Sequence, residues 1–289
     1  MPYRTLALLL ASSFALAQAP AHPEMLVSTQ WLADHAKDPD LVILQISDEK
    51  KDYDRGHIPG ARWLPYSEII VDHSGSMGVI PPLDQVAATL SRLGVSDKSH
   101  VVVYTTDWYP YAARVYYTLD YLGHGGHTSV LDGGILTWKH ENRALETSTP
   151  QWTPATFTPH ITTHVQASFE EAQAATAASS KTVLLDARPE KRYTAAHLPG
   201  AQHLYWRDTV VDEKENPVLL PPDKLRALLA AQHITPDTPV ITYCEVGYQA
   251  SHDYFIAKYL GYNAEMYDGS FYEWNDMKKQ PVIKGDQPR

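Results

Sequence analysis

The chain contains a single cysteine, Cys244, and its sequence context suits a nucleophile. An apolar β-type run, residues 239–243, precedes it, and a helix is predicted from His252 to Leu260. At a junction between a strand and a helix, the loop N–H groups and the helix dipole are expected to lower the pKa of a thiol and to hold an anion. The alternative is a buried structural thiol, since a free cysteine commonly behaves as a small apolar side chain.

The first 19 residues are typical of a secretory signal. Arg4 supplies a positive start, residues 6–16 form an apolar stretch, and residues 17–19 read Ala-Gln-Ala, a small-x-small cleavage pattern. An uncleaved anchor is the alternative interpretation. We expect an exported protein, periplasmic in a Gram-negative cell and otherwise secreted. A single cysteine cannot form an internal disulfide, and an odd thiol in an oxidising compartment is open to oxidation, which favours a thiol that reacts.

Composition limits the partners. The 289 residues carry a formal net charge of -10, which argues against nucleic acid and anionic membrane surfaces. After signal cleavage no segment is long and apolar enough to span a membrane. The 14 histidines lack paired ligand spacing with cysteine or glutamate, and no glycine-rich phosphate-loop motif occurs. We therefore expect no metal, no cofactor, no nucleic acid and no membrane partner, and a monomer.

The chain repeats itself once. Four blocks of the first half recur in the same order in the second half. The matched pairs are residues 54–61 with 194–201, 101–104 with 240–243, 121–123 with 259–261, and 131–134 with 267–270. Two copies are too few for a solenoid, so the pattern indicates a tandem duplication of one domain.

Each copy alternates predicted strands with predicted helices, which indicates an α/β sandwich around a mainly parallel sheet. Such sheets bind ligands beyond the carboxyl ends of their strands, where Cys244 falls. A segment rich in threonine and proline separates the copies and reads as a linker. The predicted organisation is a signal peptide at 1–19, an N-terminal domain at 20–147, a linker at 148–165 and a C-terminal domain at 166–289.

Three features together resemble the rhodanese family: the His-x-Pro-Gly-Ala blocks at 57–61 and 197–201, the strand–Cys–loop–helix around Cys244, and the Asp-Gly-Ser turn at 268–270 followed by Trp274. The resemblance covers nearly the whole mature chain. It implies two tandem rhodanese-like α/β sandwich domains, each around a five-stranded sheet, as in thiosulfate and 3-mercaptopyruvate sulfurtransferases. In such tandem proteins the C-terminal copy carries the catalytic cysteine.

The duplication provides an internal control. Cys244 aligns with Thr105 of the first copy, which has no thiol there. Asp186 and Arg188 of the second copy are aligned with Ile46 and Asp48. The first copy thus lacks the thiol, the acid and the arginine together, and we expect it to be non-catalytic and either to be structural or to shape the cleft between the domains.

The resemblance implies a two-step transfer in which Cys244 takes a sulfane sulfur as a persulfide and passes it to a thiophilic acceptor such as cyanide or a thiol. Arg188, and more weakly Arg192, are expected to hold a small anionic donor. Asp186 is expected to orient Arg188 or the backbone, and Ser270 and Trp274 to shape the wall near the loop. His197 recurs as His57 in the copy without a thiol, so we assign it to packing. The residues expected to form the substrate loop are Glu245, Val246, Gly247, Tyr248, Gln249 and Ala250.

The donor stays open at this level. Thiosulfate-specific relatives tend to carry basic residues in the two positions after the cysteine, where this chain has Glu245 and Val246, and mercaptopyruvate-type relatives carry small residues throughout the loop. We expect thiosulfate as the donor, with 3-mercaptopyruvate as the alternative. A non-enzymatic persulfide carrier or binding protein is a further hypothesis. A Cys-x5-Arg phosphatase is disfavoured because Ala250 occupies the position of the arginine.

Overall fold

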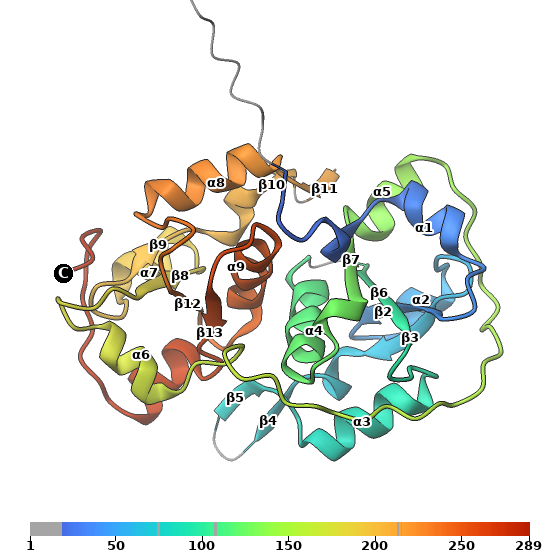
Figure 1. Cartoon of the computed structure of the whole chain (residues 1–289), viewed down its shortest axis with the longest axis horizontal. Coiled ribbons are helices and arrows are strands. Elements are labelled where there is room, and N and C mark those ends of the chain that lie inside the picture. Colours follow the sequence, from blue (N-terminus) through green and yellow to red (C-terminus); the bar gives the residue numbers. More distant parts are fainter. Residues whose placement is uncertain (1–18, 74–75, 107–108, 213, 215) are drawn as a thin grey trace, which may run out of the picture.

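The computed structural model describes residues 19–73, 76–106, 109–212, 214 and 216–289. They form two α/β domains side by side, the N-terminal one blue to green and the C-terminal one yellow to red (Figure 1). The predicted secretory signal lies outside the described residues apart from Ala19. In the part of the chain that is described, no helix has the length and apolar character needed to cross a membrane.

The N-terminal domain is built on a five-stranded sheet in the order β1-β7-β6-β2-β3, in which every pairing is parallel. Its strands alternate with helices along the chain, as predicted. The strands are β1 (Leu26–Val27), β2 (Leu41–Ser47), β3 (Arg62–Pro65), β6 (His100–Thr105) and β7 (Thr128–Leu131), and the helices are α1 (Thr29–His35), α2 (Lys50–Asp54), α3 (Leu83–Arg92), α4 (Pro110–Tyr121) and α5 (Gly134–His140).

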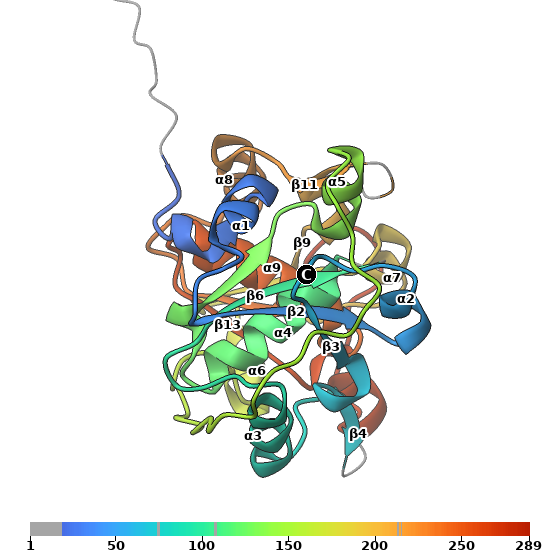
Figure 2. The ribbon, with the colours of Figure 1, turned by 90° about the vertical axis from the view of Figure 1, so that its right-hand side faces the viewer.

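Helices bury both faces of this sheet, which explains why its strands read as continuous apolar runs. Alternate strand residues point to opposite faces. Ile43 and Val102 pack with residues of α1 and α5 on one face. Leu44 and Val103 pack with residues of α3 and α4 on the other. Figure 2 looks at this domain from its outer side.

The C-terminal domain has the same architecture, except that a single bridge takes the place of the fifth strand. Its sheet has the order β13-β12-β8-β9, again parallel throughout. In the place of a fifth strand, Gln166 forms a single parallel bridge to Met266. The strands are β8 (Val183–Asp186), β9 (Gln202–His203), β12 (Val240–Tyr243) and β13 (Ala264–Met266), and the helices are α6 (Phe169–Ala175), α7 (Glu190–Ala195), α8 (Pro222–Ala231), α9 (Tyr248–Tyr259) and the π-helical turn η5 (Tyr272–Met277).

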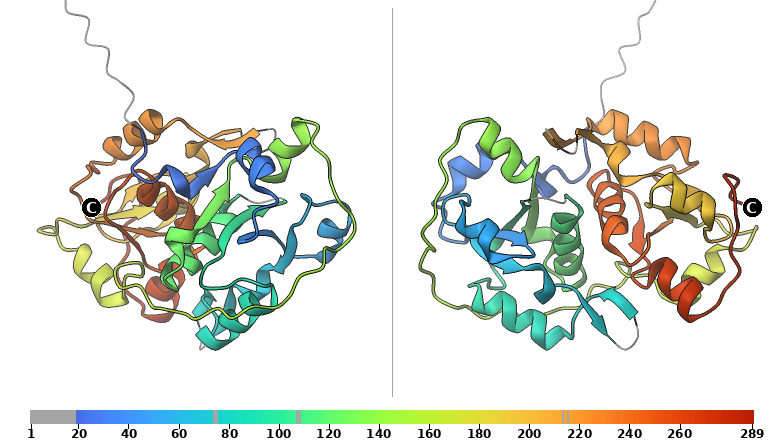
Figure 3. Two further views of the ribbon diagram at one scale, coloured as in Figure 1. Left: turned by 45° about the vertical axis from the view of Figure 1, so that its right-hand side comes forward. Right: turned by 180° about the vertical axis from the view of Figure 1, so that it is seen from behind.

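The domains meet through equivalent helices, α4 and α9, which lie next to each other (Figure 3). Tyr116 contacts Phe255 edge to face, and Tyr117 contacts Tyr254 in the same way. The Tyr254 hydroxyl donates to Asp120 at 2.6 Å. One hydrophobic cluster therefore runs through both domains. An apolar interface of this kind limits motion between two domains.

Two antiparallel hairpins reach across the boundary. Hairpin β4–β5 (Val71–His73 and Ser76–Val79) belongs to the N-terminal domain and contacts η5 of the other domain. Hairpin β10–β11 (Val210–Asp212 and Asn216–Leu219) belongs to the C-terminal domain and contacts α5. Figure 1 shows the two hairpins at opposite ends of the boundary, β4–β5 at the lower end towards α3 and β10–β11 at the upper end towards α5.

The segment between the domains packs on the N-terminal domain. Ala155 N donates to Ser91 O, and His160 N donates to Leu122 O. Phe157 is buried against the same domain. Residues 147–165 contain no helix or strand and form the extended stretch that passes α3 in Figure 1.

The strand register corrects one alignment made from the sequence. Gln45 of β2 pairs with Tyr104, and Asp186 of β8 pairs with Tyr243. Because the two tyrosines are equivalent, Asp186 corresponds to Gln45, one residue earlier than the predicted Ile46. Each tyrosine hydroxyl also accepts a backbone N–H at the same place, at 3.0 Å in the first domain and 3.2 Å in the second.

The same shift places Ser47, and not Asp48, at the position of Arg188. The Ser47 side chain is buried and donates to Glu49 O at 3.1 Å. The alignment was wrong by one residue because an apolar run carries no mark of its register. The first domain still lacks both the acid and the arginine at these positions.

Candidate active site at the Cys244 loop

Cys244 follows directly on β12 and lies at the carboxyl end of the parallel sheet. Its side chain is 1% exposed. Helix α9 begins at Tyr248, four residues before the predicted start at His252. Gly247 precedes the helix with φ +86°, a left-handed conformation that favours glycine. The turn from strand to helix therefore occupies only residues 244–247.

Three backbone amides of this turn and of the first helical residues are directed at the Cys244 sulfur. They belong to Val246, Gln249 and Ala250. Burial raises the pKa of the thiol, the three amides lower it, and the net pKa is raised above its ordinary value. The predicted lowering was therefore wrong in sign, because removal of a thiolate from water outweighs the three N–H donors. The predicted cradle of loop amides is present.

The other side of the loop rests on the Asp-Gly-Ser turn. Cys244 N donates to Ser270 Oγ at 3.2 Å, and Phe271 N donates back to Cys244 O at 2.9 Å. Tyr272 N donates to Glu245 O at 3.0 Å. These bonds place Ser270 against the loop. Trp274 lies in the core on the α6 face, where its Nε1 donates to Pro281 O at 2.8 Å.

Arg188 is buried and tied to carboxylates. Its Nη2 lies 2.7 Å from Asp186 Oδ2, and its Nη1 lies 3.3 Å from Glu245 Oε2. The guanidinium also lies 4.1 Å from the centre of the Phe271 ring. Burial lowers the pKa of Arg188, and Asp186, Tyr243 and Glu245 together raise it by more, so the group stays protonated. Any anion that binds Arg188 has to compete with two acids.

Asp186 is placed to orient this arginine. Its Oδ1 accepts the backbone N–H of Arg188 at 2.9 Å, and both its oxygens accept Arg188 Nε, at 3.0 and 3.1 Å. Glu245 is less constrained, since its side chain is 43% exposed. Arg192 is exposed on α7, and in the described part of the chain its side chain forms no ion pair or hydrogen bond. The structure thus brings Asp186, Arg188 and Glu245 together and leaves Arg192 apart.

Both histidines of the His-x-Pro-Gly-Ala blocks are fully buried. His197 Nδ1 lies 2.9 Å from Tyr193 O, and its Nε2 lies 3.1 Å from Gln287 O. His57 makes the same contact to Tyr53 O at 3.0 Å. Each ring stacks on the tyrosine four residues before it. This geometry is that of a packing residue.

The N-terminal domain covers the loop with residues that the sequence analysis did not identify. Arg114 of α4 forms an ion pair with Asp268, and its Nη1 lies 3.4 Å from Gly247 O. Tyr66 is buried, contacts the Tyr248 ring edge to face, and has no hydrogen-bond partner for its hydroxyl among the described residues. In the sequence, Arg114 stands alone within the apolar run of α4, and this pattern could have indicated a buried ion pair.

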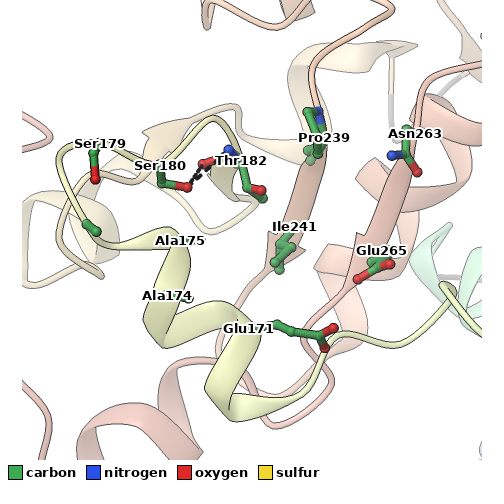
Figure 4. Close-up of a pocket in the computed structure, with 12 residues that line it drawn as sticks. Glu171, Ala174, Ala175, Ser179, Ser180, Thr182, Pro239, Ile241, Asn263 and Glu265 are labelled. Atoms are coloured by element: carbon green, nitrogen blue, oxygen red, sulfur yellow. Dashed lines mark hydrogen bonds between the residues drawn. The ribbon is translucent and has the colours of Figure 1, made fainter.

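Two sizeable cavities lie away from the Cys244 loop. One of about 370 Å³ lies under α6, beside the beginnings of β12 and β13 and thus at the opposite end of the sheet from Cys244 (Figure 4). Its walls carry alanine, serine and threonine side chains with Glu171 and Glu265, and Cys244 does not line it. Among the described residues, no three histidine, cysteine, aspartate or glutamate side chains form a group that could hold a metal ion.

The rhodanese-like domain model matches residues 28–141 and 168–277 of the chain. The sulfur carrier protein TtuD of Thermus thermophilus is 30% identical over 92% of this chain and 99% of its own length. The thiosulfate sulfurtransferase of Corynebacterium glutamicum is 27% identical over 93% of each chain. The crystal structure of SseA from Escherichia coli, described as a 3-mercaptopyruvate sulfotransferase, superposes with a TM-score of 0.74 at 25% identity, covering 86% of this chain and 98% of that one.

The fold, the cysteine at the strand–helix junction and these matches define one class of enzyme, the sulfurtransferases. The chain belongs to the rhodanese family and contains two tandem copies of its domain.

Proposed function

We propose that this protein transfers a sulfane sulfur from a small anionic donor, thiosulfate in the first place, to a thiophilic acceptor through a persulfide on Cys244. The observation that carries the proposal is the cradle of three amides directed at the sulfur of the only cysteine in the chain. Such N–H donors stabilise both a thiolate and the terminal sulfur of a persulfide.

The two steps balance without an external oxidant. The Cys244 thiolate attacks the outer sulfur of thiosulfate, the sulfur–sulfur bond of the donor breaks, and sulfite leaves with the electron pair. Cyanide or a thiolate then attacks the terminal sulfur of the persulfide, and the Cys244 thiolate is released. The enzyme alternates between a free and a loaded form, as expected for covalent catalysis.

Arg188 is the proposed anion-binding residue, with Asp186 as its orienting partner. The guanidinium lies beside Glu245, the residue that follows the cysteine. Glu245 is partly exposed and can turn away from Arg188, whereas Asp186 is fully buried. An anionic donor would therefore replace Glu245 on Nη1 and leave the Asp186 contacts intact. 3-Mercaptopyruvate, whose carboxylate can bind at the same place, is the alternative donor.

A persulfide carrier is a second candidate function. Cys244 is buried, and its thiol pKa is raised, so little thiolate is present at neutral pH. Both features favour slow exchange with small molecules and retention of a bound sulfur. A relative named as a sulfur carrier protein adds weight to this reading.

Intact-mass measurement separates these functions. We expect wild-type protein to gain one sulfur atom from thiosulfate and to lose it to cyanide over many cycles, and the Cys244→Ser variant to gain none while remaining folded. If the protein gains sulfur from 3-mercaptopyruvate and not from thiosulfate, 3-mercaptopyruvate is the donor. Loading without turnover would identify a carrier, and retained turnover in Cys244→Ser would refute the persulfide mechanism.

We also propose that the protein is exported. The support is the pattern of residues 1–19. The sequence of the mature N-terminus tests this proposal: a chain that begins at Pro20 in the periplasm or the medium would support it, and a full-length chain confined to the cytoplasm would overturn it.

A further inference from the structure

One arginine of the N-terminal domain is buried against the Cys244 loop. Arg114 is 0% exposed, and its Nη1 lies 2.5 Å from Asp268 Oδ1 of the other domain. The same nitrogen lies 3.4 Å from Gly247 O, and Nη2 donates to Gly78 O at 3.0 Å. Burial lowers the pKa of Arg114, and Asp268, Tyr117 and Tyr66 together raise it by more, so the guanidinium is charged. One cation thus joins α4, hairpin β4–β5, the Asp-Gly-Ser turn and the loop.

Arg114 contacts the loop at Gly247, the residue at which the chain turns from the strand into the helix. Gly247 has φ +86°, and a Cβ added there would lie 2.7 Å from both Arg114 Nη1 and Asp268 Oδ1. The loop backbone is therefore seated directly on the ion pair. The Gly247 carbonyl lies on the side of Arg114, and the amides of Val246 and Gln249, before and after it, are directed at the sulfur.

The duplication supplies a comparison within the same molecule. Residues 121–123 match 259–261, an offset of 259 − 121 = 138, so the residue equivalent to Arg114 is 114 + 138 = 252, a histidine. Asp132 is equivalent to Asp268 because residues 131–134 match 267–270. Asp132 accepts Leu219 N of hairpin β10–β11 at 2.9 Å, and Asp268 accepts Ile80 N, next to hairpin β4–β5, at 3.4 Å.

The two junctions share their architecture but differ in charge. His252 is buried and uncharged, since burial lowers its pKa to about 3, and its Nε2 lies 2.7 Å from Thr209 Oγ1. Among the described residues no arginine forms an ion pair with Asp132, and burial raises the pKa of this carboxyl group to about 6. The buried arginine–aspartate pair is found at the junction beside Cys244, and a neutral histidine takes its place at the junction beside the loop that lacks a thiol.

We propose that Arg114 is a positioning residue for sulfur transfer: supplied by the N-terminal domain, it holds Asp268 and the Gly247 carbonyl so that the loop amides face the Cys244 sulfur. The proposal rests on the proposed role of Cys244 as the sulfur-accepting thiol. It gives the N-terminal domain a part in the active site although that domain contains no cysteine.

Thiol alkylation tests the proposal without sulfur transfer. The pH dependence of Cys244 alkylation by iodoacetamide would be measured for wild type, Arg114→Gln and the matched control Asp132→Asn, which alters the equivalent junction. We expect Arg114→Gln to move the midpoint up by about one pH unit, a roughly tenfold loss of thiolate at a given pH. We expect Asp132→Asn to leave the midpoint unchanged. Urea unfolding of each variant reports its stability separately.

Asp268→Asn provides a second variant, in case Arg114→Gln does not fold, and is expected to shift the midpoint in the same direction. If folded Arg114→Gln and Asp268→Asn show the same alkylation midpoint as the control Asp132→Asn, the proposal is overturned. A protein that shows the expected midpoint shift but gains sulfur from no donor would instead refute the proposed function and leave the positioning role in place.

Discussion

His252 gives a quantitative prediction, because it is a titratable side chain that the folded protein keeps uncharged. It is 0% exposed, the rings of Tyr109 and Trp206 lie 5.4 and 5.6 Å from its own, and its Nδ1 has no hydrogen-bond partner among the described residues. Burial lowers its pKa from 6.5 to about 3. The unfolded chain therefore takes up a proton at His252 at pH values where the folded chain does not.

The sign and size of the effect follow from proton linkage. A lowered pKa in a base gives a stabilising contribution that is complete above pH 6.5 and is lost as the pH falls toward 3. For these two pKa values, the loss between pH 7 and pH 5 is about 2 kcal/mol. In wild type, carboxylates with raised pKa values, Asp132 and Asp253, act in the opposite direction. The two aspartates are present in both wild type and a His252 variant, so their contribution cancels in the difference between the two free energies of unfolding.

The variant is His252→Gln, whose side-chain amide can still reach the Thr209 hydroxyl. Urea unfolding of wild type and variant at pH 7 and pH 5 gives the two free energies of unfolding. We expect the variant to be less stable at pH 7 and this deficit to shrink by about 2 kcal/mol at pH 5. A deficit of the same size at both pH values would show that His252 takes up protons equally in the folded and the unfolded chain and would refute the reasoning.

Two further predictions concern the arginine beside the loop. Arg188→Ala leaves the buried Asp186 carboxylate without its ion-pair partner, so we expect the free energy of unfolding in urea to fall by about 3–5 kcal/mol. Arg192 is exposed, and Arg192→Ala should change this free energy by less than about 0.5 kcal/mol. Equal effects of the two substitutions would contradict the buried ion pair. Glu245→Gln frees one edge of Arg188, and because Glu245 is partly exposed we expect a KM for thiosulfate about fivefold lower, worth about 1 kcal/mol. An unchanged KM would mean that the donor does not bind Arg188.

The sequence was sufficient for the family, the duplication and the nucleophile, because each depends on local patterns. The apolar runs of β2, β6, β8 and β12 predict buried parallel strands, and the lone cysteine after β12 predicts the site. The repeated His-x-Pro-Gly-Ala blocks also place His57 and His197 in packing roles. The reduced fifth strand of the C-terminal sheet, a single bridge at Gln166, carried no such pattern.

The environment of the site was decided by the tertiary structure. The sequence places Arg188 near the loop, but only the fold pairs it with both Asp186 and Glu245. The sequence predicts a thiol of lowered pKa from its position, yet the depth of burial raises it. Arg114 reaches Asp268 across 154 residues of sequence. Contacts between segments so far apart depend on how α4 and α9 pack together, and burial depends on what covers a residue from every side, so neither is contained in a local pattern.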